Sequence, residues 1–404
     1  MTKNLKVFFI IISIILIQFV SFSSFATNRI VHIPNFKVGA ERLDIYLSQL
    51  KGKRVALLIN QTSVVYNKLL LDTLISRGVN VVKIFVPEHG FRGTADAGAH
   101  IKNEIDTKTG LPVISLYGKN KKPSVEQMKD IDILVYDLQD VGVRFYTYIS
   151  TLEYAMDACI ESSKELLILD RPNPNRHVID GPVLDTNLKS FVGMQPVPVV
   201  YGMTVGEYAQ MIVGECWIKN AKALQFKVIA CQDYSGDLRE DYKLPVSPSP
   251  NLKNMTAIYY YPSLCFFEGT IVSVGRGTER PFQQWGHPDY KGKFHYSFMP
   301  KSTVGATQPL LENQECFGDN LLNDSYEARK QLDRKLNLSY LLRAYQFSPQ
   351  KDKFFNPFFE KLAGTKLLRQ QIIEGKSEAE IRSSWQPELD KFKAIRKKYL
   401  LYED

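Results

Sequence analysis

The most constraining feature of the sequence is an alternation of short apolar runs with amphipathic stretches in the first half of the chain. The runs at 54–60, 81–86, 112–117, 131–136 and 165–169 have the length and composition of buried strands. Amphipathic patterns at 69–77, 146–163 and 205–217 predict helices, the last capped by Thr204 with Glu207 three residues later. This order predicts an α/β fold, a Rossmann-like and mostly parallel sheet with helices on both faces.

The composition and the hydrophobic pattern of the chain change at about residue 226. Residues 245–251 are too rich in Pro and Ser for a helix or a central strand, and residues 269–281 should hold a short strand and a Gly-rich loop. Helical patterns follow near the end, at 378–384 and 389–399. Because 404 residues exceed one typical core, we expect two domains, an α/β domain at 27–225 and a smaller α+β domain at 226–404.

The N-terminus has the pattern of an export signal. Lys3 and Lys6 precede an apolar run at 7–20, and small residues at Ser24 and Ala26 suit signal-peptidase cleavage. The sequence therefore predicts a signal peptide at 1–26 and a periplasmic protein, with secretion or a retained N-terminal anchor as the alternatives.

Composition excludes several classes of function. Hydrophobic residues make up 44% and charged residues 23% of the chain, as in soluble globular proteins. The net charge of +8 is spread along the chain, which disfavours a nucleic-acid arm and suits an acidic neighbour in the cell envelope. Five widely spaced cysteines predict no disulfide scaffold, and Cys159 and Cys265 should be buried thiols. The Gly-rich loop lacks a phosphate-binding motif, so no nucleotide cofactor is expected.

Polar residues follow every expected strand, at 60–62, 88–89, 117–118, 137–140 and 170–173. The carboxyl ends of parallel strands meet at one edge of the sheet and form the ligand crevice. The sequence therefore predicts that these five clusters converge on one pocket.

Three carboxylates are candidates for acid–base chemistry. Glycosidic cleavage needs a proton donor at the leaving oxygen, and Glu88 stands between an apolar strand and a Gly-bracketed loop, where burial would raise its pKa. The alternative is an ion pair between Glu88 and Arg92. Asp137 or Asp140 could be the second carboxylate, although either could equally cap a turn at the strand end.

Other side chains suit binding. Arg144, Arg171 and Arg276 could grip an anionic substituent through bidentate contacts, or could form structural ion pairs. His89, Asp96 and His100 admit a metal site with Glu88 as a fourth ligand, but their spacing matches no metal motif, and we expect no metal.

Several motifs together resemble those of one known family. They are PEHGFRG at 87–93, DLQDVGVRFYTY at 137–148, DRPNP at 170–174, SPN at 249–251, FEGT at 267–270 and GRGT at 275–278. In this order they resemble the exo-acting β-N-acetylmuramidases, long known as a domain of unknown function. One departure is Ala99, where many relatives carry an acidic residue.

The resemblance implies a Rossmann-like catalytic domain at 27–225, a C-terminal α+β domain at 226–404 that closes the cleft, and a glycoside hydrolase without a cofactor. It would release N-acetylmuramic acid (MurNAc) from the non-reducing end of peptidoglycan fragments such as MurNAc–N-acetylglucosamine. Glu88 stands where the family has its proposed catalytic glutamate. The second catalytic group is not assigned, and its candidates are Asp137, Asp140, Glu268 and Glu279. The residues expected to bind substrate are His89, Arg92, Asn60, Gln139, Arg144, Tyr146, Arg171, Asn173, Glu268, Arg276 and Glu279.

Two other readings remain open. A non-catalytic module could bind peptidoglycan sugars through the aromatic patch at 259–267. A metal-dependent envelope hydrolase could use His89, Asp96 and His100. The oligomeric state is not predicted.

Overall fold

A computed structural model of the chain describes residues 36–87, 104–118, 120–235, 243–322, 324–332 and 334–403. The expected signal peptide at 1–26 lies outside these ranges and stays a prediction. In the described part of the chain, no helix combines the length and the apolar character that a membrane crossing requires.

A seven-stranded sheet organises the first half of the chain. Its strands are β1 (Val55–Ile59), β4 (Val81–Val86), β5 (Glu104–Ile105), β6 (Pro112–Ser115), β7 (Ile133–Asp137), β8 (Glu165–Leu169) and β9 (Phe226–Ile229). They lie in the order β5-β6-β4-β1-β7-β8-β9, and every neighbouring pair is parallel except β5 with β6. The expected mostly parallel sheet is confirmed. A separate hairpin pairs β2 (Val64–Val65) with β3 (Lys68–Leu69).

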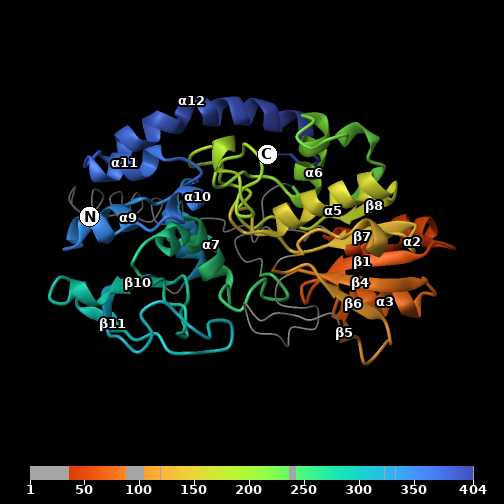
Figure 1. The fold of residues 1–404 in the computed structure, drawn as a ribbon, viewed down its shortest axis with the longest axis horizontal. Coiled ribbons are helices and arrows are strands. Elements are labelled where there is room, and N and C mark those ends of the chain that lie inside the picture. The colour runs from red at the N-terminus through yellow and green to blue at the C-terminus, as the bar shows by residue number, and fades with distance from the viewer. Residues whose placement is uncertain are drawn as a thin grey trace, which may run out of the picture. The chain divides into compact units, whose positions relative to one another are not determined.

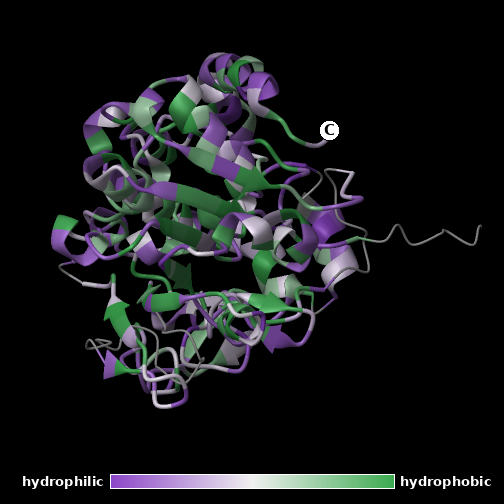
Figure 2. Cartoon of the chain, turned by 90° about the vertical axis from the view of Figure 1, so that its right-hand side faces the viewer, coloured by the Kyte–Doolittle hydropathy of each residue, from purple (hydrophilic) through white to green (hydrophobic). Residues whose placement is uncertain are grey.

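Helices cover both faces of this sheet. Successive strand residues point to opposite sides, so each strand contributes apolar side chains to a core on either face. From β1, Ala56 and Leu58 join the core shared with α5 (Tyr148–Ser162) and α6 (Val205–Gly214). Leu57 and Ile59 join the core shared with α2 (Leu43–Leu50) and α3 (Leu70–Ser76). Strands buried on both faces are continuously apolar rather than alternating. Figure 1 shows the strands side by side in the sheet, and Figure 2 shows the hydrophobic residues of the sheet in green.

Local signals in the sequence set several element bounds. The Thr204 hydroxyl accepts from the Glu207 amide at 3.3 Å, and the Glu207 carboxylate accepts from the Thr204 amide at 2.8 Å. The expected capping box at the start of α6 is therefore confirmed, although the helix ends at Gly214, before the expected residue 217. A short helix, α4 (Val125–Met128), begins in the same way at Ser124.

The second half combines helices with a smaller antiparallel sheet. Strands β10 (Gln284–His287), β11 (Tyr296–Phe298) and β12 (Cys316–Asn320) lie in the order β10-β12-β11. The helices are α7 (Met255–Leu264), α8 (Ser325–Leu332), α9 (Ser339–Phe347), α10 (Phe359–Ala363), α11 (Leu367–Ile373) and α12 (Glu378–Arg396). Short 3₁₀ helices lie at Gly39–Glu41, Thr186–Leu188, Ala221–Ala223, Cys265–Gly269, Pro288–Tyr290, Lys351–Lys353 and Lys397–Tyr399.

Two details of this half differ from expectation. The strand expected within 269–281 is replaced by isolated bridges, Thr270 with Phe355 and Ser273 with Gly286. The two helical patterns near the end form one helix, α12, which runs through Pro387. The boundary expected at residue 226 stays a prediction, and strand β9 begins there and extends the first sheet beyond it.

The segment after α12 returns to the first sheet. The Tyr402 hydroxyl donates to Asp170 Oδ2 at 2.6 Å, just beyond β8. The Leu401 amide donates to Glu207 Oε1 at 2.9 Å, and Arg176 Nη2 donates to the Tyr402 carbonyl at 3.0 Å. All these partners in the first half are buried, so the returning segment completes the hydrogen bonding of that half.

The five cysteines all lie in the described ranges and none forms a disulfide. Cys159 and Cys265 are buried, as expected. Burial raises the pKa of the Cys159 thiol to about 12, which suits a structural residue.

Candidate active site

Polar residues from three strand ends meet at the carboxyl edge of the large sheet. Beyond β1, the Ser63 hydroxyl donates to the Asp137 carbonyl at the end of β7. The Gln139 amide donates to Thr62 Oγ1 at 3.1 Å, and its side chain reaches the Pro172 carbonyl beyond β8 at 2.7 Å. Three of the five expected clusters, those after β1, β7 and β8, are thus joined by hydrogen bonds. The cluster at 88–89 lies outside the described residues, and none of these bonds involves the cluster at 117–118.

Asp137 and Arg171 form a bidentate pair within this edge. Arg171 Nε donates to Oδ1 at 2.5 Å and Nη2 to Oδ2 at 2.9 Å, and the two side chains are 3% and 0% exposed. Burial raises the pKa of Asp137, and the positive charge of Arg171 opposes that rise. Because Arg171 engages both carboxylate oxygens, this geometry favours a supporting role for the pair over direct contact with a substrate.

Asp140 is also buried. Its Oδ2 accepts from the Gly142 amide at 2.6 Å and from the Tyr201 hydroxyl. Burial raises the pKa of Asp140 to about 6. Gly142 has a φ of +74°, and a side-chain Cβ there would meet Asn173 at 2.1 Å. Asp140 therefore caps the tight turn after β7, which is the structural alternative that its sequence pattern allows.

Arg144 occupies a structural position where the sequence suggested a substrate contact. The side chain is fully buried, and its Nη1 group donates to the carbonyls of Pro182 and Val197 at 2.9 and 2.7 Å. Its Nη2 group donates to the carbonyls of Leu362 and Ala363 at 3.0 and 2.8 Å. Burial lowers the pKa of Arg144 to about 9. The guanidinium binds carbonyls from both halves of the chain rather than an anionic substituent.

A cavity of about 150 Å³ lies beside the carboxyl edge, and we call it the Tyr146 cavity. Both halves of the chain contribute to its lining, which consists of Phe145, Tyr146, Thr147, Tyr148, Ser249, Asn251, Leu252, Tyr261, Glu268, Arg276 and Phe282. Three of the residues expected to bind substrate, Tyr146, Glu268 and Arg276, therefore line one cavity. A fourth, Asn60, reaches it indirectly, because its Nδ2 donates to the Tyr148 hydroxyl at 2.6 Å.

Arg276 and Glu268 place opposite charges in the wall of the Tyr146 cavity. Arg276 Nε donates to Glu268 Oε1 at 2.5 Å, and the side chains are 35% and 24% exposed. Burial alone would lower the pKa of Arg276, but the Glu268 carboxylate raises it above its ordinary value, so the guanidinium stays charged. The guanidinium also lies over the Phe282 ring, 5.1 Å from its centroid. Among the described residues, none hydrogen-bonds to the two terminal Nη groups, which are therefore available to an anion.

The remaining candidates do not line this cavity. Gln139 and Asn173 are 3% and 2% exposed and bond to backbone carbonyls, including that of Met203 at 2.8 Å from Asn173. The Glu279 side chain is 92% exposed and lies 3.3 Å from Lys253 Nζ.

Several candidates lie outside the described residues. They are Glu88, His89 and Arg92, together with Asp96 and His100 of the metal-site reading. Among the ranges that the structure covers, no group of three or more His, Cys, Asp or Glu side chains has the arrangement of a metal site.

The aromatic patch at 259–267 is not a binding surface. Its members Tyr259, Tyr260, Phe266 and Phe267 are at most 1% exposed and belong to the main core. Only Tyr261 of the patch lines the Tyr146 cavity. The interpretation of these residues as a sugar-binding patch, which motivated the non-catalytic binding module, is therefore wrong.

The candidate list omitted other residues of the cavity. Tyr148, Ser249 and Asn251 line it, and Asn251 Nδ2 donates to the Gly305 carbonyl at 2.7 Å. All three belong to the quoted motifs at 137–148 and 249–251, so the motifs themselves carried the signal.

Comparison with known proteins covers nearly the whole described chain. Residues 55–256 match the family model described as exo-β-N-acetylmuramidase NamZ, N-terminal, and residues 259–402 match its C-terminal counterpart. The peptidoglycan β-N-acetylmuramidase NamZ of Bacillus subtilis (strain 168) is 37% identical over 395 residues, which is 93% of each chain.

Two crystal structures of DUF1343 family proteins from Bacteroides fragilis NCTC 9343 share this fold. One is 48% identical, with a TM-score of 0.84 over 92% of this chain and 99% of that chain. The other is 29% identical, with a TM-score of 0.77 over 91% of this chain and 99% of that chain.

Proposed function

This chain belongs to the NamZ family of exo-β-N-acetylmuramidases, and from that premise we propose how it recognises and cleaves its substrate. The protein is a glycoside hydrolase that acts on peptidoglycan. We propose that it releases terminal MurNAc from the non-reducing end of peptidoglycan fragments of the MurNAc–N-acetylglucosamine type. The observation that carries this proposal is the charged and partly apolar Tyr146 cavity at the carboxyl edge of the sheet.

Arg276 supplies the recognition of the terminal sugar. MurNAc differs from N-acetylglucosamine by a lactyl ether, whose carboxylate is negatively charged at neutral pH. Glu268 occupies only the Nε side of the guanidinium, so the two Nη groups can donate to both oxygens of that carboxylate in a bidentate contact. The aromatic walls of the cavity, including Tyr146 and Tyr261, suit the apolar face of a sugar ring.

Glu88 is the proposed general acid, which protonates the leaving oxygen. The chain supports this role through its connectivity. Glu88 follows Pro87 directly, Pro87 ends the described segment after β4, and β4 is the neighbour of β1 in the sheet. The residue after β1, Asn60, bonds to the cavity residue Tyr148 at 2.6 Å. Glu268 is a carboxylate in the cavity wall and the candidate best placed for the second group.

The test is an assay of free MurNAc released from MurNAc–N-acetylglucosamine by residues 27–404. We expect release by the wild type, no release by Glu88→Gln, and no effect of a chelator. Full activity of Glu88→Gln would remove Glu88 from the mechanism. Activity lost to a chelator and restored by zinc would favour the metal-dependent reading instead.

We also propose that residues 1–26 direct export and that the enzyme works in the periplasm. The charged start, the apolar run at 7–20 and the small residues at Ser24 and Ala26 support this location. Cell fractionation and N-terminal sequencing test it, and we expect a mature periplasmic protein that begins at Thr27. Recovery of the uncleaved chain in the cytoplasm would contradict the proposal.

A further inference from the structure

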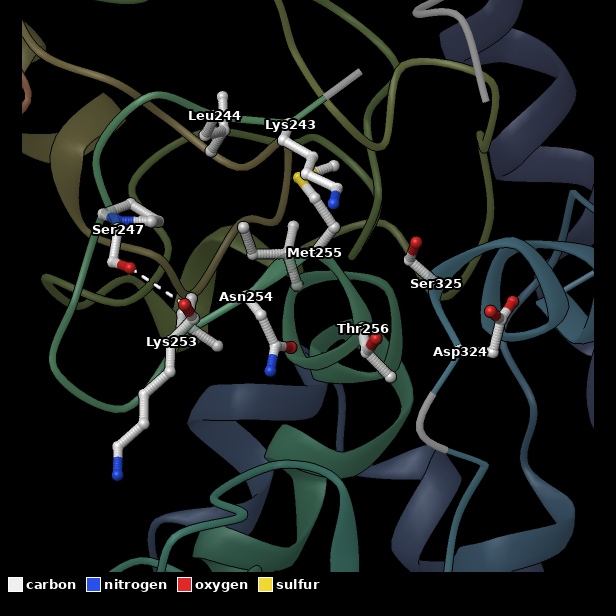
Figure 3. Close-up of a pocket in the computed structure, with 12 residues that line it drawn as sticks. Lys243, Leu244, Ser247, Lys253, Asn254, Met255, Thr256, Asp324 and Ser325 are labelled. Atoms are coloured by element: carbon white, nitrogen blue, oxygen red, sulfur yellow. Dashed lines mark hydrogen bonds between the residues drawn. The ribbon is translucent and has the colours of Figure 1, made fainter. Parts of the chain in front are cut away.

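A second cavity, of about 460 Å³, lies at the N-terminal end of helix α7, and we call it the α7 cavity. Its volume falls in the usual range for small-ligand sites. Figure 3 shows its lining, which consists of Lys243, Leu244, Ser247, Pro248, Leu252, Lys253, Asn254, Met255, Thr256, Ile258, Asp324 and Ser325. None of these residues belongs to the candidate list derived from the sequence.

The α7 cavity adjoins the Tyr146 cavity. Leu252 lines both, and Pro248 of the α7 cavity accepts a hydrogen bond through its carbonyl from the Tyr146 hydroxyl at 2.8 Å. The segment that carries these two residues therefore borders both cavities. An exo-acting enzyme needs a confined pocket for the terminal sugar and a roomier path for the rest of the chain, and the two volumes, about 150 and 460 Å³, fit this order.

Unpaired donors point into this second site. Thr256 is only 5% exposed and lines the cavity, yet within the described ranges no residue hydrogen-bonds to its hydroxyl. The cap residue Asn254 accepts from the Ala257 amide at 2.9 Å. The amides of Met255 and Thr256, at the start of the helix, have no acceptor among the described residues, as helix N-termini allow. Because the Thr256 hydroxyl and these two amides have no partner within the described ranges, they are available to a ligand that offers oxygen atoms.

The charges around the cavity indicate a neutral ligand. Lys243 and Lys253 line it together with Asp324, and Lys253 Nζ lies 3.3 Å from the Glu279 carboxylate. Lys253 is thus paired with a carboxylate outside the lining, and Lys243 and Asp324 leave one cation and one carboxylate in the lining, which gives no net attraction for a phosphate or a carboxylate. Hydroxyl, amide and charged groups alternate with aliphatic side chains such as Ile258. This mixture suits a sugar, which has many hydroxyls, an amide and an apolar ring face.

We propose that the α7 cavity binds the N-acetylglucosamine unit on the leaving side of the scissile bond, and with it the start of the remaining glycan. The inference rests on the proposed release of terminal MurNAc. In this arrangement Thr256 and the first amides of α7 hold oxygen atoms of the leaving sugar, while the Tyr146 cavity holds the sugar that is released. The enzyme then prefers a sugar as leaving group over a small aromatic alcohol.

Thr256→Val tests this subsite, because valine keeps the branched shape of threonine and replaces the hydroxyl with a methyl group that cannot hydrogen-bond. Thr73→Val is the matched control, since Thr73 is 8% exposed on α3 and lines neither cavity. The substrates are MurNAc–N-acetylglucosamine and 4-nitrophenyl β-N-acetylmuraminide, which has no sugar on the leaving side. Loss of one hydrogen bond should raise KM for the disaccharide about 3- to 10-fold in Thr256→Val. Turnover of the aryl substrate should stay unchanged, and the control should match the wild type on both.

Unchanged aryl turnover also shows that the variant is folded and that its terminal-sugar site is intact. Equal losses on both substrates, or no loss on either, would overturn the subsite. Ser325→Ala, from a different helix of the same cavity, should reproduce the selective rise in KM, and its failure to do so would count against the subsite as well. A wild type that cleaves neither substrate would refute the release of MurNAc itself, and the subsite with it.

Discussion

Replacing Arg276 with Gln tests whether this guanidinium selects the terminal sugar by charge. Glu268 holds the Nε side at 2.5 Å, which leaves the two Nη groups for the lactyl carboxylate of the substrate. A hydrogen bond to a charged group contributes about 1.5–3 kcal/mol. The Arg276 side chain is 35% exposed, so water weakens the pair of bonds, and we take about 3 kcal/mol for both together. At 1.36 kcal/mol per factor of ten, kcat/KM for a MurNAc glycoside should fall about 100-fold.

The assay compares two aryl glycosides that differ only in the lactyl group. Steady-state kcat/KM is measured on 4-nitrophenyl β-N-acetylmuraminide and on the corresponding N-acetylglucosaminide. Arg276→Gln should lose activity on the first and change little on the second, so the preference of the enzyme for MurNAc should shrink by the same 100-fold factor. Arg276→Lys keeps the charge as a single ammonium group and should lose about 10-fold.

The single variant leaves the Glu268 carboxylate, 24% exposed, without its partner. The N-acetylglucosaminide separates this effect from the loss of recognition, because a disturbed Glu268, the candidate second catalytic group, would slow the turnover of both glycosides alike. Thermal unfolding checks that each variant is folded. The reasoning is refuted if Arg276→Gln loses equally on both glycosides, or if it keeps the preference of the wild type for MurNAc.

Two further predictions concern the buried charges of the carboxyl edge. Arg144→Met leaves four buried carbonyls without their donor and should lower the free energy of unfolding, measured in urea, by about 3 kcal/mol or more. The control is Arg343→Met, which breaks an exposed pair with Asp319 and should change the free energy of unfolding by less than about 1 kcal/mol. Asp140→Asn should weaken the pH dependence of stability. Because burial raises the folded pKa of Asp140 from 3.8 to about 6, the native state holds this proton more tightly, and the stability it contributes below pH 4 is lost as the pH rises to about 6. The loss is about 2–3 kcal/mol, and urea titrations at pH 4 and 7 that give the variant and the wild type the same difference would contradict it.

The sequence predicted the central strands well because their burial on both faces leaves a continuous apolar signal. The bounds of β4 and β8 match the expected 81–86 and 165–169, and the other three expected strands lie within about two residues. The edge strands β5 and β9 were missed. Strand β5 consists of two exposed residues, and β9 has only one buried residue. Neither strand therefore has the continuous apolar run that marks the central strands.

The site was predicted in part. The convergence of the strand ends follows from topology alone, and so the sequence could predict that Gln139 and Arg171 lie at one edge. The role of Arg144 could not be predicted, because two of its four acceptors, Leu362 and Ala363, are about 218 residues away in the sequence. The aromatic patch was misread for a similar reason. A run of tyrosines such as 259–261 can lie on a surface or in a core, and the sequence looks the same in both cases. Whether it is buried depends on the elements packed against it.

The return of residues 401–402 to the first sheet makes the last residues of this chain a part of the fold of its first half. Asp170 and Glu207 are fully buried, and each receives a hydrogen bond from a segment more than 190 residues further along the chain. A fragment that stopped at residue 256, where the N-terminal family model ends, would leave these carboxylates with fewer donors and without the cover of Tyr402. Exchange of C-terminal halves between relatives should therefore succeed only when the contacts of Leu401 and Tyr402 are exchanged with their partners, since chain segments so far apart form those contacts late in folding.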